Sequence, residues 1–248
     1  MLERHIARAL RSRLASCALL AAAAAAGGQD LHAPLDALLR EYVDDQGKVA
    51  YRDLAARDRP ALAGYLRALA EAEPARLSAQ EQIAFWLNAY NAHVLQGVLD
   101  GHDGEGFFVR KRFFSFYAFP LAGKTRTLDE VEHDILRAQY REPRIHFALV
   151  CAATSCPKLR REAYRGDRLD AQLDDQARGF LNDPARNQFG PGETARISMI
   201  FKWFEDDFDA AAGSVAAFLR RWVTIGDQAK IEYLDYDWTL NAQPGQRP

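Results

Sequence analysis

One long helical segment, residues 78–100, constrains the fold of this chain more than any other stretch. It opens with Ser78-Ala79-Gln80-Glu81, a capping box in which the serine oxygen and the glutamate side chain bind backbone N–H groups that the first helical turn leaves without partners. Large apolar residues then surround most of the helix: Ile83, Trp86, Leu87, Tyr90, Val94 and Val98. A helix that is apolar on most sides belongs inside the core, so the other elements must pack around it.

Two asparagines lie within this apolar helix. The spacing i, i+4, i+7, i+11 forms one stripe from Ala84, Asn88, Asn91 and Leu95. Because a buried amide without a partner costs about 1–3 kcal/mol, both asparagines need hydrogen-bond partners. We predict that they hold the backbone of a neighbouring loop. The alternative is that one of them orients a catalytic imidazole or a substrate.

The other elements follow one another irregularly. Helical spacing or capping predicts helices over residues 32–43, 60–72, 127–140, 169–181 and 214–223. Apolar or aromatic runs predict strands over residues 107–121, 145–150, 195–200 and 231–240, with a hairpin turn at Ala122-Gly123-Lys124. Because strands and helices do not alternate regularly, we predict an α+β fold with helices packed around a small, mostly antiparallel sheet and one long central helix.

Composition sets the size of the core and excludes some partners. The chain has 248 residues, of which 48% are hydrophobic and 27% charged, enough for one substantial core. Its formal net charge is −2, so no overall field attracts nucleic acid or an anionic membrane. We expect a single domain over residues 30–241 and a disordered tail over residues 242–248. The sequence contains no recognised cofactor motif, and we expect no cofactor.

The first 26 residues have the pattern of an export signal. A basic region (Arg4, Arg8, Arg11 and Arg13) precedes an apolar run of about 13 residues and a cluster of small residues suited to cleavage. That run is too short to cross a bilayer, which needs roughly twenty helical residues. We therefore predict a signal peptide over residues 1–26 and a periplasmic or secreted protein with no transmembrane segment after its removal. The alternative is lipidation at Cys17, although the apolar run follows this cysteine where a lipoprotein signal has it first.

The two cysteines that remain after such a cleavage lie close together. The apolar residues 145–150, bounded by Pro143, predict a buried strand that ends in a tight loop at Cys151, and Cys156 follows in that loop. His146 precedes Cys151 by five residues. The stretch therefore combines a thiol with an imidazole, and both cysteines enter an oxidising compartment.

Four roles for this region fit the sequence. A thiol enzyme needs a thiolate, a base and a group that orients the base; the candidate catalytic residues are Cys151, His133, His146, Asn88, Asn91 and Glu132. Residues 146 and 151 of a straight strand point to opposite faces, which makes His133 the better base. A Cys151–Cys156 disulfide would close a small loop and add only about 2 kcal/mol, so it could be redox-labile. Zinc is the third role, but the spacing matches no familiar motif and we expect no metal. The fourth role is a binding module with a buried polar core.

Four blocks in this order resemble a known family: residues 85–91 (FWLNAYN), 128–137 (LDEVEHDILR), 144–164 and 236–241 (YDWTLN). They are similar to the family catalogued as domain of unknown function 547, and the resemblance covers roughly residues 35–241. It implies a protein that is often exported in bacteria and for which no activity is settled.

We expect the functional cleft where the 78–100 helix meets residues 145–157. The leading hypothesis is a thiol-dependent hydrolase or acyl transferase that uses a Cys/His pair. The alternative is a non-catalytic module that binds a small molecule, peptide or protein and contains a structural Cys151–Cys156 disulfide. Candidate binding residues are Arg137, Arg144 and Tyr90. A helical cluster such as Glu132, His133 and Arg137 is more often a salt-linked surface than a functional site.

Overall fold

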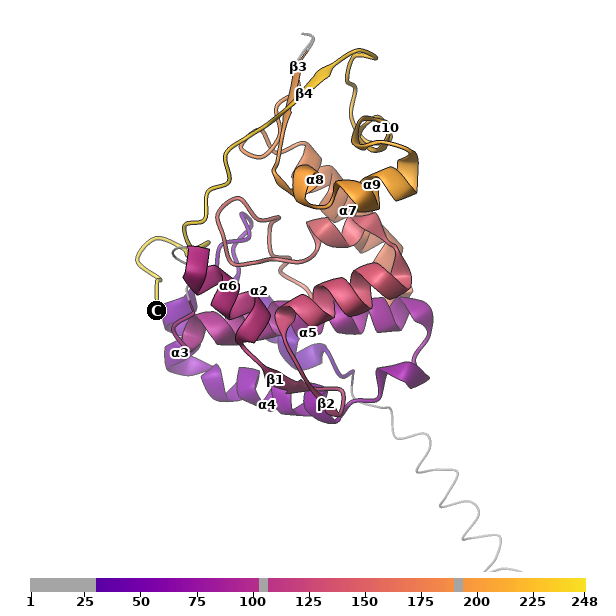
Figure 1. Cartoon of the computed structure of the whole chain (residues 1–248). Coiled ribbons are helices and arrows are strands. Elements are labelled where there is room, and N and C mark those ends of the chain that lie inside the picture. The colour runs from indigo at the N-terminus through magenta and orange to yellow at the C-terminus, as the bar shows by residue number, and fades with distance from the viewer. Residues whose placement is uncertain (1–29, 103–106, 190–193) are drawn as a thin grey trace, which may run out of the picture. The chain divides into compact units, whose positions relative to one another are not determined.

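The computed structural model describes residues 30–102, 107–189 and 194–248, so the predicted export signal lies outside the described residues. The chain divides into two units, Met1–Leu31 and His32–Pro248, and the second contains all the elements below (Figure 1). Its α-helices are α2 (Ala33–Tyr42), α3 (Tyr51–Arg57), α4 (Arg59–Glu71), α5 (Ala79–Leu99), α6 (Phe107–Phe116), α7 (Leu169–Leu181), α8 (Ile200–Trp203), α9 (Glu205–Ala212) and α10 (Val215–Leu219). Its other elements are η1 (Pro74–Arg76), η2 (Glu130–Tyr140), η3 (Pro143–Phe147), η4 (Gly166–Arg168), β1 (Phe119–Leu121), β2 (Lys124–Arg126), β3 (Thr194–Ile197) and β4 (Lys230–Tyr233).

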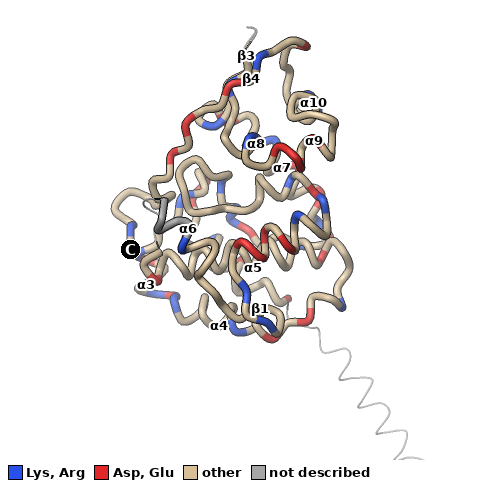
Figure 2. Tube along the Cα trace, viewed as in Figure 1, with Lys and Arg blue, Asp and Glu red and all other residues tan. Residues whose placement is uncertain are grey.

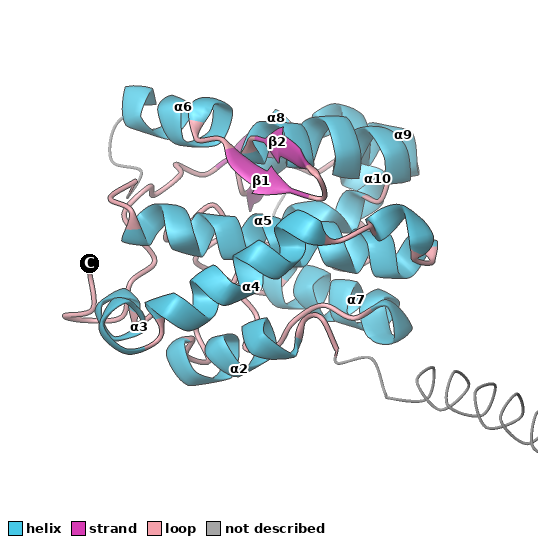
Figure 3. Ribbon diagram, turned by 90° about the horizontal axis from the view of Figure 1, so that it is seen from below, coloured by secondary structure: helices cyan, strands magenta, loops and turns pink. Residues whose placement is uncertain are grey.

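Helix α5 is the central element, as predicted. Its capping box is present: the Ser78 side chain accepts a hydrogen bond from the Glu81 N–H, and the Glu81 carboxylate accepts one from the Ser78 N–H. Every residue from Ala84 to Leu95 is buried. Helices α3, α4 and α7 and the segment η2 all contact α5, and Figure 3 shows α4 lying along it beside the β1–β2 hairpin. The α+β class and the long central helix are confirmed.

The strands form two separate pairs rather than one sheet. β1 and β2 are antiparallel, and the partners Leu121 and Lys124 enclose a two-residue turn at Ala122 and Gly123, both with positive φ. This is the hairpin that the sequence predicted. β3 and β4 are parallel, with Thr194 opposite Lys230, and belong to chain segments far apart in sequence.

A second core of phenylalanine rings lies between α7 and the α8–α10 helices. Phe147 contacts four rings of this core, those of Phe180, Phe201, Phe208 and Phe218, with centroids 5.1, 5.8, 5.9 and 6.1 Å away. Figure 1 shows α8, α9 and α10 together with the β3–β4 pair at the top of the view. Burying such rings fixes the position of η3, the segment that contains Phe147 and the candidate residue His146.

Two predicted strands are helical in the structure. The expected strand over residues 145–150 is the end of η3, a 3₁₀-helix, followed by a loop; Pro143 lies in its first turn and the Glu142 side chain accepts the Arg144 N–H. A short apolar run is equally compatible with a buried strand or a buried helical turn, and among the described residues this run pairs with no strand. The aromatic run over residues 107–121 is helix α6 and then the short strand β1.

The predicted disorder of residues 242–248 is also wrong as far as Gln246. The backbone N–H of Gln243 donates to the Val49 carbonyl at 3.0 Å, and the Arg52 N–H donates to the Gln246 carbonyl at 3.0 Å. The end of the chain is therefore held against the segment before α3 by backbone hydrogen bonds, which no local sequence pattern reveals.

Charged residues of both signs alternate over the described residues (Figure 2), in agreement with the net charge of −2. Among the described residues, no helix combines the length and the apolar character that crossing a membrane requires.

Candidate functional site

A cavity of about 260 Å³ brings together five of the residues selected from the sequence: Tyr90, Glu132, His133, His146 and Cys151. The remaining lining residues come from α6, the start of η2, the cysteine loop, α8 and its following residue, and the C-terminal segment: Phe114, Ser115, Asp129, Leu149, Pro157, Ile200, Trp203, Phe204, Tyr236 and Trp238. Most of the walls are aromatic, and two carboxylates face the same space. This cavity is the candidate site.

Glu132 is placed by a second capping box and a rare helix. The Thr127 N–H donates to the Glu130 carboxylate at 2.7 Å and the Glu130 N–H donates to the Thr127 hydroxyl at 3.2 Å, which starts η2 as predicted. η2 is a π-helix, a form that occurs often at functional sites. The Tyr90 hydroxyl on α5 donates to Glu132 at 3.2 Å. Burial raises the pKa of Glu132 to about 7, although the Tyr90 hydrogen bond lowers it in part.

The two histidines share one ionic cluster around Asp207. Arg137 donates through Nε and Nη2 to the two oxygens of Asp207, at 2.6 and 3.0 Å, and His146 Nε2 lies 2.7 Å from the same carboxylate. His133 Nδ1 lies 2.9 Å from Arg137 Nη1. Burial lowers the pKa of both histidines, and Arg137 lowers that of His133 further. Both imidazoles are therefore neutral at pH 7, and neither adds a positive charge to the cavity.

Asp207 keeps its negative charge because it is paired. Burial raises the pKa of Asp207, but the hydrogen bonds from His146 and Arg137 outweigh this effect and hold it well below the ordinary value. Arg137 lies behind the cavity wall, over the ring of Phe204, and does not line the cavity. The helical Glu–His–Arg cluster thus divides: Glu132 and His133 face the cavity, and Arg137 supports it from outside.

Asn88 and Asn91 are structural rather than catalytic. Asn91 donates to the Ala148 carbonyl at 3.0 Å and accepts the Val150 N–H at 3.0 Å. Asn88 makes the same two-point contact with the carbonyl and N–H of Tyr164, both at 2.8 Å. Both are buried, at 1% and 4% exposure, so the predicted burial and loop-holding role is confirmed. Neither lines the cavity, and the alternative in which one of them orients an imidazole is wrong.

Cys151 and Cys156 form a disulfide on the cavity wall. Their loop is tied to the C-terminal segment by backbone hydrogen bonds: Thr154 N–H to Thr239 O, Ser155 N–H to Asp237 O, and Asn241 N–H to Ala152 O. The Tyr236 hydroxyl lies 3.4 Å from Cys151 Sγ and 3.3 Å from Cys156 Sγ. The sequence blocks 144–164 and 236–241, which are far apart in the chain, therefore lie against each other in the structure.

Arg144 is not part of the site. Its guanidinium binds Glu142, Asp170 and Asp174, at 2.7, 2.7 and 2.5 Å, and it links η3 to α7. This predicted binding residue is therefore a structural ion pair, because three carboxylates already occupy its donors. Among the described residues, no group of three or more His, Cys, Asp or Glu side chains is placed to hold a metal ion.

Ten of the fifteen described residues that line the cavity were not selected from the sequence. Tyr236 and Trp238 lie in the 236–241 block, so that block was the available signal for them. Asp129 precedes Glu132 and His133 by three and four residues, a spacing that indicates a shared helical face. No sequence pattern indicated that Trp203 and Phe204 line the cavity, because only the tertiary fold brings α8 to the cysteine loop.

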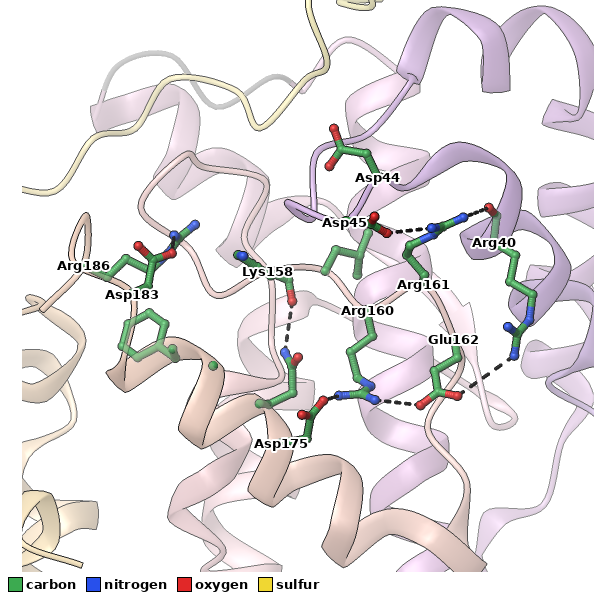
Figure 4. Close-up of a pocket in the computed structure, with 14 residues that line it drawn as sticks. Arg40, Asp44, Asp45, Lys158, Arg160, Arg161, Glu162, Asp175, Asp183 and Arg186 are labelled. Atoms are coloured by element: carbon green, nitrogen blue, oxygen red, sulfur yellow. Dashed lines mark hydrogen bonds and ion pairs between the residues drawn. The ribbon is translucent and has the colours of Figure 1, made fainter. Parts of the chain in front are cut away.

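A larger cavity of about 390 Å³ lies on another face and is lined by charges that are mostly paired (Figure 4). Arg160 binds both Glu162 and Asp175, and Arg161 binds Asp45. Figure 4 shows these side chains pointing toward one another rather than into open space. Because most of its charged side chains are paired with one another, this cavity presents few charged groups that are available to bind a ligand.

Comparison with known proteins agrees with the resemblance of the sequence. Residues 74–181 match the family described as "Protein of unknown function, DUF547". The same comparisons found no matching curated protein and no matching solved structure. The matched segment contains α5, η2 and both cysteines, and hence all five sequence-selected residues of the cavity. The chain therefore contains a DUF547 domain over residues 74–181.

Proposed function

We propose that the protein binds a compact small molecule that has an aromatic or aliphatic body and a protonated amine. The observation that carries this proposal is the pair Asp129 and Glu132, two carboxylates on the wall of a mostly aromatic cavity. Among the described residues neither has an ion pair; Asp129 accepts a hydrogen bond from Ser115, and Glu132 accepts one from Tyr90. A positive group supplied by a ligand would compensate this acidity.

The aromatic walls support the same choice of ligand. Trp203, Tyr236 and Trp238 lie against one another with ring centroids 4.5 to 5.6 Å apart. Ring faces attract a cation, by about 0.5–2 kcal/mol, and also bury an apolar body. The volume of about 260 Å³ suits a ligand smaller than typical drug-sized molecules.

Binding is better supported than thiol-dependent catalysis. A hydrolase or acyl transferase that uses Cys151 needs a free thiolate with a base beside it. Cys151 is bonded to Cys156, so in this state its sulfur is no nucleophile, while the carboxylates and aromatic rings of the cavity are all in place. This reasoning favours the non-catalytic alternative of the two functions predicted from the sequence.

Tryptophan fluorescence and calorimetry test the proposal with three ligands of similar shape. 2-Phenylethylamine carries the cation, 3-phenylpropionate carries an anion, and 2-phenylethanol is neutral. We expect the amine to bind tightest, and Glu132→Gln to weaken it by about tenfold, since a hydrogen bond to a charged group contributes roughly 1.5–3 kcal/mol. Asp134→Asn is the matched control, because Asp134 is on the same helix but is exposed and outside the cavity. Equal binding of amine and carboxylate would refute the choice of ligand.

We also propose that the protein is exported, which the N-terminal pattern of the sequence supports. A disulfide between Cys151 and Cys156 is consistent with an oxidising compartment.

A further inference from the structure

The two sulfurs of the disulfide have different surroundings. Cys151 is half-buried and lines the aromatic cavity, so a small molecule in the cavity reaches its sulfur. Cys156 is 1% exposed and is not among the residues that line the cavity. A thiol that enters from the cavity therefore meets Cys151 first.

Three hydrogen-bond donors point at the buried sulfur. The backbone N–H of Cys151 lies 3.1 Å from Cys156 Sγ, the backbone N–H of Ala153 lies 3.4 Å from it, and the Tyr236 hydroxyl lies 3.3 Å from it. Burial raises the pKa of Tyr236 above its ordinary value, so this hydroxyl keeps its proton and stays a donor. A neutral disulfide sulfur is a weak acceptor, whereas donors fixed around a sulfur stabilise the thiolate that forms when its bond breaks.

We propose that the Cys151–Cys156 disulfide exchanges with a small thiol, with Cys151 as the attacked sulfur and Cys156 as the leaving thiolate. The thiolate of the incoming molecule forms a bond to Cys151 Sγ while the Cys151–Cys156 bond breaks and its electron pair goes to Cys156 Sγ. A second thiolate then attacks the incoming sulfur in the mixed disulfide and releases Cys151. After proton uptake, two thiols have been oxidised to one disulfide, and the protein disulfide has been reduced to two thiols.

The loop geometry keeps the three donors in place during this reaction. Ala153 pairs with Leu240, and the Thr154 N–H donates to the Thr239 carbonyl at 2.7 Å. These contacts hold the cysteine loop to the C-terminal segment independently of the sulfur–sulfur bond. A leaving group whose thiolate is stabilised departs faster, so this arrangement accelerates exchange at Cys151 rather than at Cys156. The inference goes beyond the proposed binding function and does not depend on recognition of an amine.

The experiment determines which sulfur is attacked. Full-length oxidised protein is exposed briefly to a limiting amount of 2-mercaptoethanol at pH 8, quenched with N-ethylmaleimide, and digested for peptide mass analysis. We expect the mercaptoethanol adduct on Cys151 and the maleimide on Cys156. The reverse pattern would overturn the proposal, and so would a disulfide that resists the thiol in the folded protein but reacts once urea unfolds it.

A pair of tyrosine variants tests the donors. Tyr236→Phe removes one donor from Cys156 Sγ and should slow the exchange by about tenfold, given the strength of hydrogen bonds to charged groups. Tyr233→Phe, three residues away and outside the cavity, should exchange at the rate of the wild type. The melting temperature of each oxidised variant is measured alongside; a slower Tyr236→Phe with an unchanged melting temperature supports the proposal. An unchanged rate in Tyr236→Phe would refute the role of the donors.

Discussion

Replacing Glu132 by glutamine should change how stability depends on pH. The wild-type carboxyl has a pKa of about 7 in the folded protein, against an ordinary value of 4.5, because the cavity wall buries it. Between these two values the folded protein binds more protons at this group than the unfolded chain does. The free energy of unfolding of the wild type therefore falls as the pH rises through this window, and the loss is complete above pH 7.

The size of the effect follows from the two pKa values. One pKa unit corresponds to about 1.4 kcal/mol, so ionising Glu132 costs the folded state about 3 kcal/mol at pH 8 and less than about 1 kcal/mol at pH 5. Glutamine is neutral at every pH, and its amide oxygen still accepts the hydrogen bond from Tyr90. The stability of Glu132→Gln relative to the wild type should therefore rise by about 2–3 kcal/mol from pH 5 to pH 8.

Urea denaturation at pH 5 and pH 8 measures this difference. Glu71→Gln is the control, because Glu71 is exposed at the end of α4 and its replacement should leave the pH dependence of the wild type unchanged. If the Glu132→Gln variant and the wild type differ by the same amount at both pH values, the carboxyl is not perturbed. The cavity wall would then not bury the Glu132 carboxyl enough to raise its pKa.

Three further results are expected. Asn91→Leu leaves the Ala148 carbonyl and the Val150 N–H without their hydrogen-bond partner. It should lower the free energy of unfolding, measured by urea denaturation, by about 1–3 kcal/mol. A variant as stable as the wild type would contradict the structural role of Asn91. The affinity for 2-phenylethylamine should rise between pH 6 and pH 8 by calorimetry, as Glu132 ionises, and a fall would count against the proposed ligand. Intact-mass measurement of protein from the envelope fraction should show a chain that lacks residues 1–26; a chain that begins at Met1 or is lipidated at Cys17 would exclude the predicted cleavage.

The candidate site combines a fixed support with a cavity that no lysine or arginine lines among the described residues. Asn91 holds the loop before Cys151, and Asp207 binds both His146 Nε2 and Arg137, so these contacts fix the walls around the cavity. Glu132 differs, because its only hydrogen-bond partner among the described residues is the Tyr90 hydroxyl. This contrast makes Glu132 the more informative residue for functional tests and Asn91 the more informative one for stability.

The sequence alone determined the features that depend on residues close together in the chain. Both capping boxes, the central helix and the hairpin turn follow from local rules, because the hydrogen bonds that define them join residues within about four positions. The sequence also predicted that Asn88 and Asn91 have hydrogen-bond partners, because a buried amide without a partner is unfavourable. The choice of Glu132, His133, His146 and Cys151 as one group rested on residue chemistry, and the fold places all four on one cavity.

Only the tertiary structure decided the rest. The apolar run before Cys151 begins as a 3₁₀-helix, and its Phe147 packs into a phenylalanine core to which β3 also contributes Ala195 and Ile197. The C-terminal segment lies against the cysteine loop, and so supplies Tyr236 to the disulfide, through pairings of residues more than eighty positions apart. Arg144 and Arg137 have structural roles, because each forms an ion pair with a carboxylate of a helix that lies far from it in the sequence. Such pairings depend on which surfaces meet in the folded chain. The interactions that stabilise them are distributed over the whole core, so no single segment of the sequence predicts them.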